Sequence, residues 1–100
     1  MLSVKLLKND TEGELLLIGR LDAVTAAEAE ARVVDAAERF DTLILNLEQL
    51  EYISSAGLRV IKRAHIVMRR KGGKLLIKNV TKSVMEVFEI TGFATLFKFI

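Results

Sequence analysis

The 100-residue chain has no cysteine and no proline, and its single histidine is His65. The lack of cysteine excludes disulfides, thiol nucleophiles, iron–sulfur clusters and cysteine-ligated zinc, and one imidazole cannot complete a site that needs two. Only carboxylates could hold a metal ion. We therefore expect neither a bound metal nor a cofactor.

Long apolar runs and a strong net charge are also missing. The longest purely aliphatic run is residues 15–18, far short of the roughly 18 residues that a membrane span requires, and residues 1–10 lack the apolar segment of a signal peptide. The formal net charge is only +2, which is weak evidence for nucleic-acid binding. We expect a cytoplasmic protein with no membrane insertion and no direct nucleic-acid contact.

The chain does hold enough apolar material for one core. Hydrophobic residues make up 51% of the sequence and charged residues 28%, proportions that exclude a disordered or collagen-like chain. Because 100 residues is close to the commonest domain size, we expect a single domain over residues 1–100.

Alternating apolar residues predict an antiparallel hairpin at the start of the chain. Leu2, Val4 and Leu6 alternate with polar residues, a turn follows at residues 9–13, and residues 14–21 resume as an apolar strand. Further strands are predicted at residues 42–47, 74–78 and 96–100, with residues 48–53 as a connection.

Three helices are predicted between these strands, each preceded by a Ser or Thr that can cap it. Thr25 and Glu28 have the capping-box spacing for the first helix. The other caps and the glycine stops lie at Ser54-Ser55, at Thr81 or Ser83, and at Gly72 and Gly92. The order β-β-α-β-α-β-α-β predicts an α/β fold with helices on a mixed, mostly parallel sheet.

The carboxyl ends of parallel strands form the edge at which such sheets dock ligands and partners. Three loops are expected to meet at that edge, at residues 19–24, 48–55 and 79–82. Their candidate polar side chains are Asp22, Ser54, Ser55, Asn79 and Thr81.

Two adjacent hydroxyls, Ser54 and Ser55, precede the second helix. Capping explains one of them. Alternatively, the positive end of the helix with its free N–H groups can accommodate a phosphate placed on Ser55. A nucleophilic role is excluded because the only histidine lies ten residues further on, about 15 Å along the same helix. No nucleophile elbow or phosphate-binding loop is present, so we expect no enzymatic activity.

Other polar residues have two interpretations each. His65 has the helical spacing of the neighbouring apolar residues, and a histidine in such a position is more often packed against the core than used as a ligand. Asp22 follows a strand, which suits either turn chemistry or a functional acid. The basic residues 69–71 complement a helix end but also suit an acidic partner.

Four segments of the chain carry a family resemblance. They are residues 19–22 (GRLD), 25–28 (TAAE), 45–58 (LNLEQLEYISSAGL) and 72–74 (GGK). In order, and over nearly the whole chain, these segments resemble a STAS domain of the anti-sigma factor antagonist type.

The resemblance implies a non-enzymatic switch. In such systems the unphosphorylated antagonist binds an anti-sigma factor that is also a serine kinase, phosphorylation ends that binding, and a metal-dependent serine phosphatase restores it. The implied phosphoacceptor is Ser55, with Ser54 as second choice. The implied partner-binding residues are Asp22, Thr25, Ser54, Ser55, Ala56, Gly57 and Arg59.

The usual family pattern at the acceptor is Asp-Ser-Ser/Thr-Gly, whereas this chain has Ser54-Ser55-Ala56-Gly57. The alternative function is therefore a phosphorylation-independent scaffold or regulatory module in a larger signalling or transport assembly. Gly57 is expected to allow close approach of the kinase, or else to serve tight packing within the domain.

Overall fold

The computed structural model describes residues 1–100 and contains one six-stranded sheet. Its spine runs in the order β1-β2-β3-β5-β6, with β4 paired to β2 off this path. The first two strands form the predicted antiparallel hairpin, and the other pairings are parallel. The strands are β1 (Leu2–Asn9), β2 (Glu12–Leu21), β3 (Thr42–Asn46), β4 (Leu50–Ile53), β5 (Lys74–Lys78) and β6 (Lys98–Phe99).

The strand β4 is the main difference from the predicted fold, which had residues 48–53 as a connection. Leu50–Ile53 pairs in parallel with the end of β2, at a register shift between Gly19 and Arg20. Leu50 and Ile53 are buried while the two residues between them are exposed, so the segment lacks the alternation that indicates a strand. The pairing extends the sheet to the residue before Ser54.

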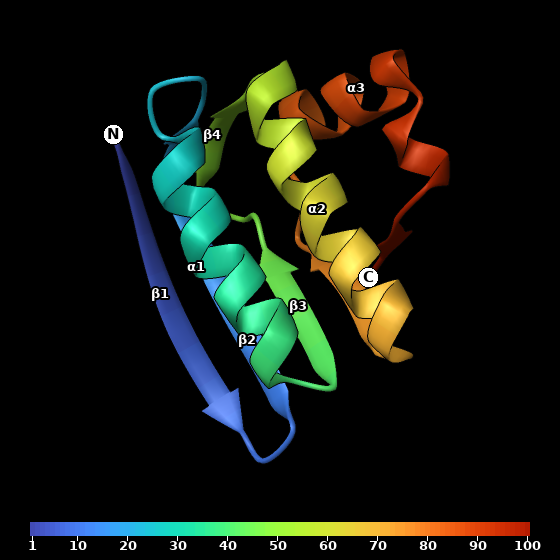
Figure 1. Ribbon diagram of the computed structural model, residues 1–100. Coiled ribbons are helices and arrows are strands. Elements are labelled where there is room, and N and C mark those ends of the chain that lie inside the picture. Colours follow the sequence, from blue (N-terminus) through green and yellow to red (C-terminus); the bar gives the residue numbers. More distant parts are fainter.

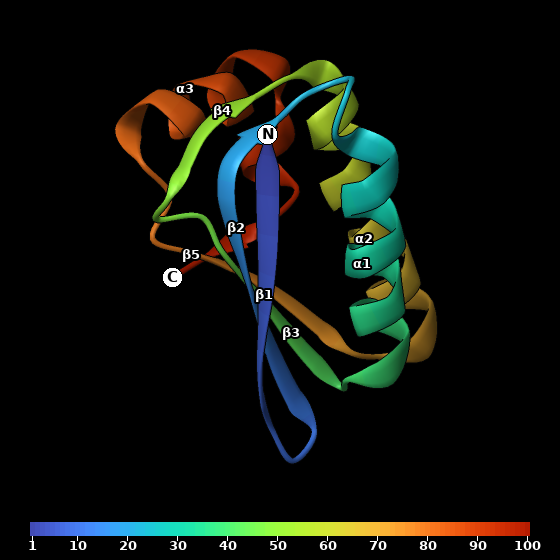
Figure 2. The same ribbon diagram turned by 90° about the vertical axis from the view of Figure 1, so that its left-hand side faces the viewer.

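The three helices are α1 (Ala26–Arg39), α2 (Ser55–Lys71) and α3 (Lys82–Thr91). In Figure 1, α1 and α2 lie side by side in front of the sheet and run in the same direction. Figure 2 shows α3 on the other side, at the end of the sheet beside β4. None of the three is long and apolar enough to cross a membrane.

Local signals placed most of the helix ends correctly. Ser54 caps α2 and Thr81, rather than Ser83, caps α3, while both predicted glycine stops adopt the left-handed conformation. The capping box at Thr25 is wrong, because that residue makes no side-chain capping bond.

A single cluster of 24 buried residues fills the space between the sheet and the helices. Near the C-terminus, Phe97 packs edge-on against Phe88, with ring centroids 5.8 Å apart. A short 3-10 helix, Phe93–Thr95, precedes it. The last strand is therefore only Lys98–Phe99, instead of the predicted residues 96–100.

Lys71 joins the ends of the two neighbouring helices. Its ammonium group donates hydrogen bonds to the carbonyl oxygens of Ala37 at 3.0 Å, Glu38 at 2.9 Å and Phe40 at 2.9 Å. These carbonyls lie at the C-terminus of α1, where no further turn supplies N–H donors and the helix dipole attracts positive charge. The basic end of α2 thus stabilises α1 as well as itself.

We expect Lys71→Met to lower the free energy of unfolding by about 2 kcal/mol, because hydrogen bonds from a charged group contribute about 1.5–3 kcal/mol and three carbonyls lose their donor. Urea unfolding followed by circular dichroism measures the change. The adjacent Arg70→Met is the matched control, since Arg70 is exposed and makes no hydrogen bond or ion pair. Equal destabilisation by both substitutions would contradict the role of Lys71.

The packed interpretation of His65 is confirmed. Its ring meets Phe97 edge-on, with centroids 5.5 Å apart, and its buried Nε2 has no hydrogen-bond partner. Burial lowers the pKa of His65 below its ordinary value, and the positive charge of Arg69 lowers this pKa further. The domain therefore holds a neutral imidazole.

We expect the free energy of unfolding to fall as the pH drops below about 6.5, the ordinary pKa of histidine. The unfolded chain binds a proton at that pKa, whereas folded His65 resists protonation until a lower pH, so acid favours unfolding. Urea titrations on either side of this range measure the loss. His65→Gln cannot titrate and should lose less stability over the same range; an equal loss would argue against His65.

Candidate functional site

The turn from β4 into α2 assigns different tasks to the two serines. Ser54 is extended, with φ −102° and ψ 177°, and its side-chain oxygen accepts a hydrogen bond from the N–H of Gly57 at 3.3 Å. Its own N–H donates to the carbonyl oxygen of Leu21 at 2.9 Å. Ser54 is therefore both the cap of α2 and the link to the end of β2.

Ser55 is left free by this arrangement. It is the first residue of α2, its side chain is exposed, and its hydroxyl makes no hydrogen bond within the domain. The first turn of α2 contains no acidic residue. An added anionic group on Ser55 would thus meet the positive end of the helix and no carboxylate from its own turn.

The loop after β2 is closed by hydrogen bonds of its own. One carboxylate oxygen of Asp22 accepts from the N–H groups of Val24 at 3.0 Å and Thr25 at 3.1 Å. The Thr25 N–H donor holds the pKa of the Asp22 carboxyl below its ordinary value, so the carboxylate stays charged. This geometry is the turn chemistry anticipated for Asp22.

Thr25 is an internal residue of the same loop. Its hydroxyl donates to the carbonyl oxygen of Arg20 at 2.9 Å and accepts from the N–H of Asp22 at 3.0 Å. The residue is buried. The hydroxyl is therefore both a donor and an acceptor within the loop and holds the loop in shape, while a place for Thr25 in the binding surface stays a prediction.

Three exposed side chains at the ends of β2 and β4 and in the loop after β2 were not identified from the sequence. The guanidinium carbon of Arg20 lies 4.3 Å from the ring centroid of Tyr52, which is 41% exposed. Val24 is 91% exposed at the tip of the neighbouring loop. Arg20 and Tyr52 are partners in the β2–β4 register, so predicting β4 would have brought them together.

Gly57 is buried, and the close approach it permits is inside the domain. A Cβ at this position would lie 2.8 Å from the side chains of Leu21 and Ile53 and from the carbonyl oxygen of Leu21. The space around Gly57 therefore favours the second of its two expected roles, tight packing within the domain. Gly57 lets the first turn of α2 rest on the ends of β2 and β4.

Two predicted residues of α2 and the predicted loop 79–82 remain to be placed. Arg59 is exposed and Ala56 is half-buried. The loop 79–82 is linked through the carbonyl of Lys78 to the N–H of Leu47 at 2.9 Å, and no hydrogen bond joins it to the serines. No group of three or more His, Asp or Glu side chains is placed to hold a metal ion.

The structure is thus a small α/β domain with a mixed sheet. At one end of the sheet it presents the N-terminus of α2, which is capped by Ser54 and carries the exposed Ser55. Comparison with known proteins identifies its family. The STAS domain model matches residues 5–100, and the chain belongs to the STAS domain family.

Individual relatives cover most of the chain. BtrV of Bordetella bronchiseptica is 37% identical over 99 residues, which cover 94% of this chain and 84% of BtrV. The anti-sigma-B factor antagonist of Bacillus subtilis is 25% identical over 91% of this chain and 84% of its own. The structure of phosphorylated SpoIIAA from Bacillus superposes with a TM-score of 0.76 and 19% identity, covering 98% of this chain and 91% of SpoIIAA.

We expect Gly57→Ala to lower the free energy of unfolding by about 1–3 kcal/mol, the usual cost of overpacking, even though alanine is the better helix former. The carbonyl oxygen of Leu21 cannot move aside without disturbing its bond to Ser54. Thermal and urea unfolding measure the effect. The control is Ser55→Ala, two residues earlier on the exposed side; a more stable Gly57→Ala would contradict the packing role.

Proposed function

We propose that this STAS domain is an anti-sigma factor antagonist. Unphosphorylated, it binds an anti-sigma factor that is also a serine kinase, and phosphorylation of Ser55 ends the binding. The main support is the division between the two serines, since Ser54 is engaged as the helix cap while the Ser55 hydroxyl is exposed and unbonded. The name of the Bacillus subtilis relative agrees with this role.

The proposed docking surface surrounds Ser55. Ala56 and Arg59 contribute from the first turns of α2, and Asp22 contributes from the adjoining loop. We add Tyr52 and Val24, because an exposed aromatic ring and an exposed aliphatic side chain supply apolar contact area beside a charged rim. Thr25 and Gly57 support this surface from beneath.

The proposed switch acts on binding and leaves the fold intact. A phosphate adds about −1.5 to −2 charges, which the N-terminal end of α2 tolerates. A partner surface shaped around a neutral hydroxyl would instead have to desolvate the dianion or oppose it with like charge. SpoIIAA, which has the same fold, has been solved in a phosphorylated form.

In this proposal the chain is the substrate and its partners are the catalysts. The kinase supplies ATP, magnesium and the catalytic base, and a metal-dependent serine phosphatase removes the phosphate. Because the kinase needs ATP, we propose that the protein acts in the cytoplasm.

A scaffold that never turns over a phosphate is the second candidate function. The observation in its favour is the sequence Ser54-Ser55-Ala56-Gly57, in which the family's acid before the acceptor and hydroxyl after it are both replaced. The structure accommodates the first replacement, because Ser54 caps the helix as an aspartate would.

We expect Ser55→Ala to fold and bind the kinase but to take up no phosphate, and Ser54→Ala to lose about 1 kcal/mol of stability while remaining a substrate. Intact-mass measurement and peptide mapping after incubation with the kinase and ATP separate the two sites. Phosphate on Ser54, with Ser55→Ala still a full substrate, would contradict the assignment.

We expect Ser55→Asp to weaken the kinase complex at least about tenfold, or about 1.4 kcal/mol, with an unchanged circular dichroism spectrum. Isothermal titration calorimetry measures the affinity, and Ser55→Asn is the neutral control of matched size. Equal affinities for the aspartate and asparagine variants would favour the scaffold.

A further inference from the structure

An open groove of about 440 Å³ runs along the outer side of α1 and α2. Its floor is made of small and aliphatic side chains, and its lining residues are Ala27, Glu30, Ala31, Val34, Asp35, Glu38, Arg63 and Val67. The two helices that line the groove lie in front of the sheet in Figure 1, and Ser55 is the first residue of α2.

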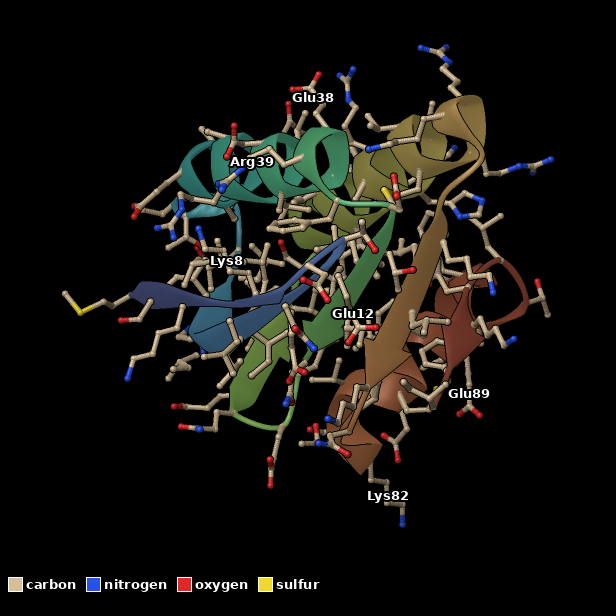
Figure 3. All side chains as sticks on the ribbon, turned by 90° about the horizontal axis from the view of Figure 1, so that it is seen from below. Lys8, Glu12, Glu38, Arg39, Lys82 and Glu89 are labelled. Carbon is tan, nitrogen blue, oxygen red and sulfur yellow. The ribbon has the colours of Figure 1, made fainter.

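The α1 side of the groove carries acidic residues and no basic ones. Glu30 and Glu38 have no ion-pair partner, and Asp35 contacts Arg39 at 3.5 Å. Figure 3 shows Glu38 projecting from the outer surface of α1, away from the sheet. The other arginine of α1, Arg32, is directed toward the carbonyl of Val4 in β1.

The α2 side has the opposite character. The helix contains six basic residues and no acidic residue: Arg59, Lys62, Arg63, Arg69, Arg70 and Lys71. Arg63, Val67 and Arg70 are spaced by three or four residues and therefore share one stripe. Both arginines of this stripe are exposed and make no ion pair within the domain. One flank of the molecule thus holds an acidic row beside a basic row.

We propose that this flank binds a second copy of the chain around a two-fold axis parallel to α1 and α2. Rotation about such an axis places α1 of each copy over α2 of the other, so both contacts join an acidic row to a basic row. An isologous pair needs only one patch that is complementary to itself. The flank has this property through its charge, and its aliphatic floor supplies the apolar contact.

The dimensions predict a weak, salt-sensitive dimer. Helices of 14 and 17 residues are about 21 and 25 Å long and about 10 Å wide each. Together they offer about 500 Å² per copy, or about 1,000 Å² in all, at the lower limit for specific interfaces. Because the axis runs along the helices, the Ser55 ends of both copies point the same way.

Two charge-reversal variants test the pairing. The acid-reversed variant is Glu30→Lys/Glu38→Lys, and the base-reversed variant is Arg63→Glu/Arg70→Glu. Each variant alone would set like charges against each other at both contacts, so we expect a rise of at least about tenfold in the dimer dissociation constant. In a mixture, the basic α1 of one variant meets the acidic α2 of the other, and the remaining contact keeps its natural charges.

Sedimentation velocity of each protein and of the equimolar mixture, from micromolar to millimolar concentration, measures the outcome. We expect wild type and mixture to dimerise, each variant alone to remain monomeric, and the wild-type dimer to weaken as salt rises from about 0.1 to about 1 M, where the screening length falls from about 10 to about 3 Å. Circular dichroism checks that both variants fold. A monomeric wild type, a dimer that survives either reversal, or a mixture that stays monomeric would overturn the proposal.

Discussion

The close contact between the first turn of α2 and the end of β2 is the constraint on which the site depends. Leu21 contributes twice, since its carbonyl accepts the Ser54 N–H and its side chain and carbonyl leave no room for a Cβ on Gly57. With the helix start held in this way, the Ser54 hydroxyl is directed to the backbone as a cap and Ser55 is turned outward. The exposed serine is thus a consequence of packing beneath it.

Most of the fold could be predicted from the sequence because its signals are local. Apolar alternation indicates the hairpin, helical stripes indicate α1 to α3, and Ser54, Thr81 and the glycines at the helix ends mark caps and stops. The β4 strand could not be found in this way, since its only evidence is the pairing of Leu50–Ile53 with a bulged part of β2. Its alternation is absent because Glu51 and Tyr52 are both exposed.

The errors in the candidate site have the same origin. Thr25 and Glu28 match a capping box by spacing, yet the Thr25 hydroxyl bonds to the carbonyl of Arg20, five residues earlier. Gly57 suggests an open surface until the side chains of Leu21 and Ile53 are seen beneath it. The roles of both residues depend on contacts with β2, and the spacing of residues along a helix does not reveal such contacts. The roles of the two serines could be predicted only in part. The sequence shows that one hydroxyl suffices for the cap, but the backbone conformation decides that this hydroxyl belongs to Ser54.

Distance separates the proposed switch from the proposed dimer contact. Arg63 lies eight residues beyond Ser55 and Arg70 lies fifteen beyond it, or about 12 and 22 Å along α2. Both distances exceed the screening length of about 8 Å at physiological ionic strength. A phosphate on Ser55 would therefore be felt by a partner at the end of the helix, while the charges along the flank would be almost unaffected. On this geometry, phosphorylation removes the kinase from each copy and leaves the charge pairing of Arg63 and Arg70 in place.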